Sequence, residues 1–202
     1  MKLFYAPGAC SMASHIVLHE IGKPFEIEKV STKTKVTENG GDFWAINPKG
    51  AVPALQLDGG EVLTEGPAIL QYVADSNGAT ELSPPTGTLA RARVQEMLSF
   101  VGSELHKSFI PLFQPGKTDA EKDATREALQ KKFAWLESLL ADGRAYLTGP
   151  TFTVADAYAF VVTNWSNLTG VSLDALPKLK DYMARVAARP SVQATMKAEG
   201  LI

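Results

Sequence analysis

A single cysteine, Cys10, lies near the amino terminus, directly after Pro7–Gly8–Ala9. The residues that follow, 11–21, have the apolar pattern of a helix, so Cys10 is expected at or near a helix start. Unpaired N–H groups and the helix dipole there favour a thiolate, and they would also attract the thiolate of a bound molecule. A lone cysteine can equally be a small buried hydrophobe. An internal dithiol pair is excluded, because the position three residues on is Ala13.

Two other stretches have the chemistry to hold a peptide-like ligand. A cis bond at Val52–Pro53 would present the backbone N–H and C=O of Val52 to such a ligand, although most X-Pro bonds are trans. Thr64–Glu65–Gly66–Pro67 lies at a strand-to-helix junction, where the N–H of Gly66 can bind a carboxylate. Glu65 beside it can accept from an ammonium group, so the pair suits an amino-acid-like ligand. The alternative is a simple helix start with a glutamate favoured by the dipole.

A third candidate is a small, polar helix face that carries a histidine. Ser99, Gly102, Ser103 and His106 are three or four residues apart, the spacing that places side chains on one face of a helix. Such a face leaves space for a ligand, and His106 could donate a hydrogen bond to a sulfur. A lone surface histidine is the plainer interpretation.

The composition narrows the class of protein. The 202 residues suffice for one large domain or two modest ones, with 45% hydrophobic residues, 21% charged residues and a net charge of −2. A nucleic-acid-binding protein would show clustered Lys and Arg residues, and this sequence has no such cluster. No apolar run approaches the roughly 20 residues of a membrane span, and the start of the chain predicts no secretory signal. With one cysteine and no disulfide, a cytoplasmic protein is expected.

The local patterns predict two domains of different class. Residues 1–80 alternate strand and helix signals in the order β-α-β-α-β-β-α, and the proline-containing residues 81–87 form a linker. Residues 88–202 show no convincing strand. Helices are predicted there at 88–112, 119–141, from the capping box Thr153–Asp156 onward, at 177–189 and at about 192–199. The sequence thus predicts a small α/β domain, then an all-helical domain, whose junction is a common place for a ligand cleft.

Six stretches, taken together, are typical of one known family. They are Pro7–Ser11, Asn47–Leu55, Leu63–Ile69, Ser103–Lys107, Phe152–Tyr158 and Ala198–Leu201. With these stretches in register, the chain resembles the bacterial glutathione transferases of the beta class over essentially its whole length. The resemblance implies a thioredoxin-like N-terminal domain with a cis Pro53, an all-α C-terminal domain and a homodimer. It also implies glutathione as co-substrate, with no other cofactor and no metal.

The resemblance further implies roles for individual residues. Cys10 and His106 are the expected catalytic residues, with Cys10 near the glutathione sulfur and His106 approaching it from the helical domain. Val52 would pair with the cysteinyl backbone of glutathione. The expected glutathione-binding residues are Cys10, Lys35, Val52, Pro53, Glu65, Gly66, Ser99, Ser103, Glu104 and His106.

The ends of glutathione are also assigned by the resemblance. Glu65 and Gly66 would hold the γ-glutamyl end, and Lys35 would reach the glycyl carboxylate. Glu104 would reach the γ-glutamyl amine across the dimer. Relatives often carry Asn where this chain has Ser99, and Ser where it has Gly66, so weaker glutathione binding is expected. Neither Tyr5 nor Ser11, whose residue types activate the sulfur in other classes, is expected to be the main group here.

The function that follows is conjugation of reduced glutathione to small hydrophobic electrophiles, in detoxification or xenobiotic catabolism. The electrophile is expected against Phe109, Ile110 and Phe113, which continue the His106 side of the helix. An alternative is glutathione-dependent thiol–disulfide exchange or peroxide reduction, since Cys10 beside another thiol can form a mixed disulfide. A non-catalytic ligand-binding protein and a purely structural use of the fold are further alternatives.

Overall fold

The computed structural model describes residues 1–202, which divide into two compact units. One unit contains Met1–Ser83 together with Ala188–Ile202, and the other contains Pro84–Ala187. The last residues of the chain therefore pack with the α/β unit and not with the helical unit, which differs from the division at 81–87 expected from the sequence. The reason is tertiary packing, because the final helix lies along the first one.

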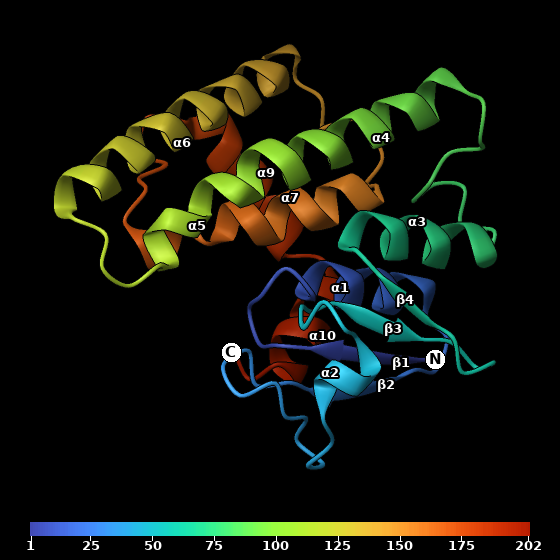
Figure 1. The fold of residues 1–202 in the computed structure, drawn as a ribbon. Coiled ribbons are helices and arrows are strands. Elements are labelled where there is room, and N and C mark those ends of the chain that lie inside the picture. Colours follow the sequence, from blue (N-terminus) through green and yellow to red (C-terminus); the bar gives the residue numbers. More distant parts are fainter. The chain divides into compact units, whose positions relative to one another are not determined.

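The α/β unit has the predicted order of strands and helices around a four-stranded sheet (Figure 1). Its elements are β1 (Lys2–Tyr5), α1 (Met12–Ile21), β2 (Glu26–Lys29), α2 (Phe43–Ile46), β3 (Ala54–Gln56), β4 (Val62–Thr64), α3 (Gly66–Ser76) and α10 (Pro190–Ala198). The strand order is β2-β1-β3-β4, with β1 parallel to β2 and antiparallel to β3, and β3 antiparallel to β4. This is the thioredoxin-like arrangement expected for the first domain.

Successive side chains of β1 point to opposite faces of this sheet, and both faces are covered. Phe4 faces one side, where it packs with Val30, Phe43 and Ala54 beneath α2. Leu3, its neighbour, faces the other side, which α1 and α3 cover (Figure 1). A sheet buried on both faces forms a rigid support, so the loops that leave its strands are held in fixed positions.

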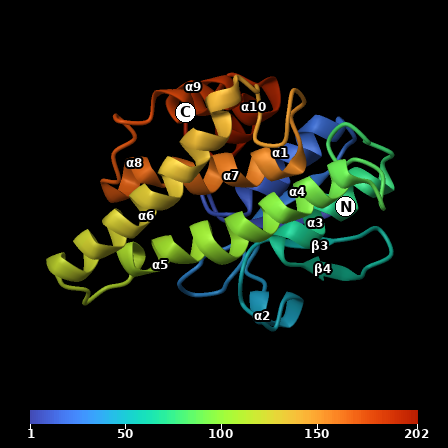
Figure 2. The ribbon, with the colours of Figure 1, turned by 90° about the horizontal axis from the view of Figure 1, so that it is seen from above.

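The helical unit contains all remaining elements. They are α4 (Leu89–Phe100), a π-helical turn (Val101–His106), α5 (Lys107–Phe113), α6 (Asp119–Leu139), a 3₁₀ turn (Leu140–Asp142), α7 (Val154–Asn164), α8 (Ser166–Thr169) and α9 (Pro177–Ala187). Figure 2 shows α4 and α5 running on from one another, with α6 alongside. The predicted helix 88–112 is therefore confirmed as a continuous segment, but it contains a π-helical turn that the sequence pattern does not reveal.

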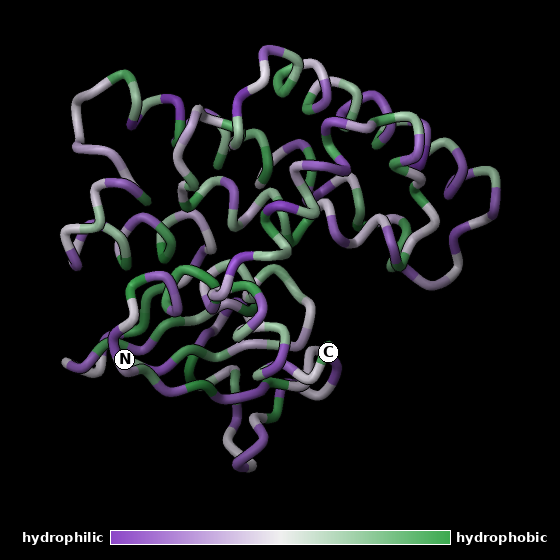
Figure 3. The backbone as a smooth tube through the Cα atoms, turned by 180° about the vertical axis from the view of Figure 1, so that it is seen from behind, coloured by the Kyte–Doolittle hydropathy of each residue, from purple (hydrophilic) through white to green (hydrophobic).

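The centre of the helical unit is α7, which is buried along almost its whole length. Its predicted capping box is present, since the Thr153 side chain and the Asp156 carboxyl each accept from the other's backbone N–H. The helices around it alternate between hydrophobic and hydrophilic residues along the chain (Figure 3), as expected of helices with one buried face. No helix in either unit combines the length and apolar character that a bilayer crossing requires.

Candidate active site

Cys10 lies in the tight turn that joins β1 to α1. The turn is closed by the N–H of Ala9, which donates to the carbonyl of Ala6 at 3.1 Å, and by that of Met12, which donates to the carbonyl of Ala9 at 3.0 Å. Cys10 thus precedes the helix, as predicted. Its thiol donates a hydrogen bond to the carbonyl oxygen of Val52 at 3.3 Å. This contact joins the Cys10 turn to the Val52–Pro53 stretch, which the sequence indicated only as separate candidates.

The electrostatics at Cys10 differ from the expectation of a favoured thiolate. Burial raises the pKa of the Cys10 thiol to about 11, although its own N–H and that of Ser11 act in the opposite direction. The negative charge of Glu65 raises this pKa further. The helix-start effect is real, but desolvation outweighs it. In the free protein at neutral pH, Cys10 is therefore a protonated thiol that donates a hydrogen bond.

This protonation state can be measured by alkylation with iodoacetamide. Because only the thiolate reacts, the rate at Cys10 should be at least about tenfold below that of free cysteine at pH 7.5. The rate should keep rising with pH and should not level off below about pH 10, since the thiol pKa is about 11. A plateau near pH 8.5 would contradict the burial of this thiol.

The two stretches expected to hold a peptide-like ligand both act on Cys10, Val52 through its carbonyl and Glu65 through its charge. The Val52–Pro53 bond is cis, as the resemblance implies, and the Pro53 ring lies 4.0 Å from where a Cβ on Gly66 would stand. Glu65, whose charge acts on the Cys10 thiol, has a positive φ of 71°. Such a backbone conformation is strained for a residue other than glycine and is often found at functional sites.

Glu65 also has a partner that the sequence did not reveal. The ammonium group of Lys49 lies 2.5 Å from a carboxyl oxygen of Glu65, and both side chains are more than half exposed. Sixteen residues separate the two, so no local spacing pattern could indicate the pair. In the free protein the Glu65 carboxylate is therefore paired with the Lys49 ammonium group.

Lys35 lies in the loop between β2 and α2, where its backbone is fixed. Its N–H donates to Ser31 at 2.9 Å, its carbonyl accepts from Phe43 at 2.9 Å, and its φ is 58°. The Lys35 side chain is partly exposed to solvent.

Two hydroxyl groups, in β1 and in the turn that follows it, are buried. Ser11 is fully buried, and its Oγ accepts from the N–H of Ala6 at 3.1 Å. Tyr5 is buried, and burial, together with the charge of Glu199, raises the pKa of its phenol. The Ser11 hydroxyl is therefore engaged within the turn, and the Tyr5 phenol is protonated at neutral pH.

In the helical unit, His106 is part of an aromatic cluster and not a lone surface histidine. Its Nδ1 lies 2.7 Å from the hydroxyl of Tyr158 on α7, and its ring stands edge-on to Trp165 at 4.8 Å. Burial lowers the pKa of His106, and the charge of Lys107 lowers it further. The imidazole is therefore neutral at pH 7, with one nitrogen engaged by Tyr158.

The serines of the predicted helix face lie on the surface, and the π-helical turn changes their spacing relative to His106. The Ser103 hydroxyl donates to the carbonyl of Ser99 at 2.8 Å. Glu104 in the same turn pairs with Lys132 of α6 at 2.8 Å, and the hydrogen bond from Lys132 lowers the pKa of Glu104. As with Lys49, nothing in the sequence pattern indicated Lys132.

The expected electrophile surface needs one correction. Phe109 is fully buried and packs against Phe133 and Trp165, so it belongs to the core and cannot contact a ligand. Ile110 and Phe113 are 44% and 52% exposed, so both can be reached from solvent. They form a small apolar surface near His106 along the same helical segment.

Comparison with known proteins matches both units of the chain. Residues 8–76 match the family model for the glutathione S-transferase N-terminal domain, and residues 119–185 match that for the glutathione S-transferase C-terminal domain. The glutathione S-transferase GstA of Escherichia coli O157:H7 is 46% identical over the full length of both chains.

Solved structures of bacterial enzymes have the same fold over the whole chain. A sphingomonad glutathione S-transferase complexed with glutathione is 49% identical with a TM-score of 0.95, covering all of both chains. The beta-class enzyme of Sphingomonas chungbukensis, 48% identical, has the same score and coverage. BphK, a bacterial transferase solved as a ternary complex, is 45% identical with a TM-score of 0.95, covering 99% of this chain and all of its own. This chain therefore belongs to the glutathione S-transferase family and is a glutathione-conjugating enzyme of the beta class.

Proposed function

We propose that the α/β unit binds glutathione along Val52 and the Glu65–Gly66 turn, with the glutathione sulfur facing Cys10. The observation that carries this proposal is the hydrogen bond from the Cys10 thiol to the carbonyl of Val52. This bond supports the proposal, because it brings the Cys10 thiol next to the Val52 backbone, which would pair with the cysteinyl residue of the tripeptide. Glu65 would accept from the γ-glutamyl ammonium group in place of Lys49, and Lys35 would bind the glycyl carboxylate.

In this proposal Cys10 acts as a hydrogen-bond donor and not as a nucleophile. With a pKa of about 11, only about one Cys10 in 10⁴ carries a thiolate at pH 7. A protonated thiol can turn from the Val52 carbonyl to the sulfur of bound glutathione and stabilise its thiolate. The glutathione thiolate then attacks the electrophilic carbon and forms the new carbon–sulfur bond, while the leaving group departs with the electron pair. Mixed-disulfide formation at Cys10 is disfavoured, because it needs either a Cys10 thiolate that attacks an existing disulfide or a Cys10 already oxidised to a sulfenic acid, which a glutathione thiolate then attacks.

His106 would supply a second donor to the sulfur. When the Tyr158 hydroxyl donates to Nδ1, the single ring proton lies on Nε2, which can then donate to a thiolate. The electrophile would be a small hydrophobic molecule held by Ile110 and Phe113, in detoxification or xenobiotic catabolism. Because the reaction consumes reduced glutathione and needs Cys10 as a thiol, a cytoplasmic location fits this chemistry.

Exchanging the cysteine tests its role. Cys10→Ala should lower the rate of conjugation to an aryl halide at pH 6.5 by about tenfold, because the thiolate loses one donor. Cys10→Ser is the matched control, since its hydroxyl still donates, and it should retain most of the activity. If both variants conjugate like the parent, Cys10 has no part in activation. If Cys10→Ala instead loses only the reduction of a mixed disulfide or a hydroperoxide, the redox alternative is correct.

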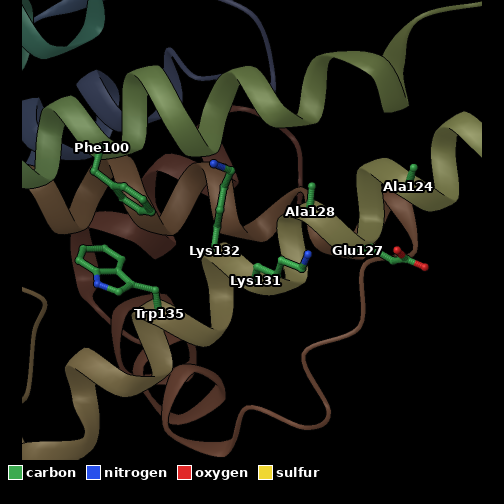
Figure 4. A pocket seen from close by; sticks show the side chains of 7 residues that line it. All are labelled: Phe100, Ala124, Glu127, Ala128, Lys131, Lys132 and Trp135. Carbon is green, nitrogen blue, oxygen red and sulfur yellow. The ribbon is translucent and has the colours of Figure 1, made fainter.

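A homodimer would complete the glutathione site. The helical unit has a groove of about 420 Å³ (Figure 4), lined from α4 by Phe100 and otherwise from α6 by Ala124, Glu127, Ala128, Lys131, Lys132 and Trp135. The Phe100 and Trp135 rings lie 4.4 Å apart at its edge, and Trp135 is 41% exposed. Lys132 in this groove holds Glu104, the residue expected to reach glutathione across a dimer. A second copy of the chain is therefore the proposed occupant.

Sedimentation measurements should accordingly give twice the mass of one chain. Trp135→Glu should shift the species toward a single chain, because it places a charge in the contact. Leu89→Glu, a change of the same kind at an apolar residue that is 73% exposed, serves as the control and should leave the mass unchanged. A parent protein of single-chain mass at micromolar concentration would contradict the dimer.

A further inference from the structure

The C-terminal segment contains a buried acidic side chain, Glu199, that lies outside both regions matched by the family models, 8–76 and 119–185. The side chain of Glu199 is 0% exposed, and that of His15 on α1 is 1% exposed. One carboxyl oxygen of Glu199 lies 2.9 Å from Nδ1 of His15, and the other accepts the backbone N–H of Gly8 at 2.8 Å. Both oxygens are thus used inside the α/β unit.

Gly8 belongs to the turn that carries Cys10. Within this turn Ser11 holds the N–H of Ala6, Pro7 has no N–H, and the N–H of Ala9 closes the turn on itself. The bond from the Gly8 N–H to Glu199 therefore anchors the middle of the turn to the far end of the chain, 191 residues away. The φ of Gly8 is positive, 69°, a backbone conformation that glycine adopts without strain.

The residue Leu201 adds an apolar contact at the same place. Its side chain lies 3.7 Å from where a Cβ on Gly8 would stand, and its N–H donates to the carbonyl of Met196 at 2.9 Å. The chain thus turns back after α10 and covers the cysteine turn from outside. The last residues of the chain touch the turn through one hydrogen bond and one apolar contact.

We propose that Glu199 is a positioning residue for the Cys10 turn. By holding the N–H of Gly8 and the ring of His15 together, it fixes the turn on α1 and keeps the Cys10 sulfur at the Val52 carbonyl. The catalytic consequence rests on the proposed function, because it requires glutathione to bind beside Cys10. The geometric part, the placement of the Cys10 sulfur, is independent of any ligand.

A second, partly buried contact between the same elements provides a control. Glu20 near the end of α1 pairs with Arg189 at 2.8 Å and with the hydroxyl of Ser191 at the start of α10. Glu20 joins α1 to the C-terminal segment as Glu199 does. Its partners lie at the start of α10, on the order of 15 Å from Glu199 at the other end of this helix, by helical rise. Loss of either acid should loosen the packing of α10, and only Glu199 touches the cysteine turn.

The test compares Glu199→Ala, Glu199→Gln and Glu20→Ala in the full-length protein. Two properties are measured besides thermal stability: the iodoacetamide reaction of Cys10 without glutathione, and KM and kcat for glutathione with an aryl halide. Glu199→Ala should alkylate about tenfold faster and raise KM about five- to tenfold with a smaller change in kcat, because a mobile turn exposes the thiol and misplaces the site. Glu199→Gln keeps an acceptor for Gly8 and should stay close to the parent. Glu20→Ala should melt earlier, with both properties unchanged.

Each outcome of this comparison either supports or contradicts the role of Glu199 as a positioning residue. If Glu20→Ala changes alkylation and KM as much as Glu199→Ala does, the segment only stabilises the fold and the proposal is wrong. The same follows if Glu199→Ala alters neither property. Should Glu199→Ala fail to fold, amide exchange in the parent decides instead: the Gly8 N–H must be protected, and exchange at the rate of an exposed loop would overturn the proposal. If the parent binds no glutathione, the proposed function fails, while alkylation still tests the positioning of Cys10.

Discussion

Glu65→Ala is expected to raise the KM for glutathione by about 10- to 100-fold, with a much smaller effect on kcat. In the proposed complex Glu65 accepts a charge-assisted hydrogen bond from the γ-glutamyl ammonium group and does not contact the reacting sulfur. Removal of this contact weakens the ground state and the transition state alike, which is the signature of uniform binding. Initial rates over a range of glutathione concentrations measure the effect directly.

Two comparisons separate this contact from a general electrostatic effect. Glu61→Ala removes an exposed carboxyl from the neighbouring hairpin and should leave the KM unchanged. A glutathione analogue without the γ-glutamyl amine should bind the parent and Glu65→Ala equally well. The analogue has no amine for Glu65 to bind, so loss of the Glu65 carboxylate removes no contact to it. If the variant still discriminates between glutathione and the analogue as the parent does, Glu65 is not the amine receptor.

Asp156→Ala is expected to lower the free energy of unfolding by about 3 kcal/mol and the melting temperature by about 10 °C. The Asp156 side chain is fully buried and accepts from the N–H of Leu147 at 2.9 Å and from both the N–H and the hydroxyl of Thr153 at 2.8 Å. The Tyr182 hydroxyl lies 3.2 Å from it as well. Without the carboxyl group these donors stay buried and unpaired, which is among the most destabilising changes a single substitution makes.

The chain offers a natural control for this prediction in its second capping box. Thr118 and Glu121 make the same reciprocal contacts at the start of α6, where both are exposed to solvent. Water can replace the lost partners there, so Glu121→Ala should lower the melting temperature far less than Asp156→Ala. Calorimetry of the two variants compares one motif in two environments. Equal losses in melting temperature would mean that burial does not determine how much a capping box stabilises the fold.

The features that could be predicted from the sequence are those with a local signal. The apolar patterns indicated the strand and helix order of the α/β unit, and Thr153 and Asp156 indicated the start of α7. The cis bond at Pro53 and the family followed from motifs that resemble a known class. Each of these signals lies within a dozen residues of sequence.

What could not be predicted depends on contacts between distant residues or on burial. The pairs Lys49–Glu65 and Lys132–Glu104 join residues without a periodic relation. The pKa of Cys10 is set by how deeply its sulfur is desolvated, which the helix-start argument does not include. Phe109 shares its apolar character with the exposed Phe113, and only the packing of α7 and α6 around it decides which of the two is core.

The assignment of 188–202 to the α/β unit has a consequence for synthesis on the ribosome. Residues 1–83 emerge first, but the unit to which they belong lacks α10 until the intervening 84–187 have been made. At translation rates of about 5–20 residues per second, this interval lasts roughly 5–20 s. The helical unit is contiguous and can complete its folding first. The nascent cysteine turn therefore acquires its anchor to Glu199 only after residues 84–187 have been made, so the cysteine turn reaches its final structure late.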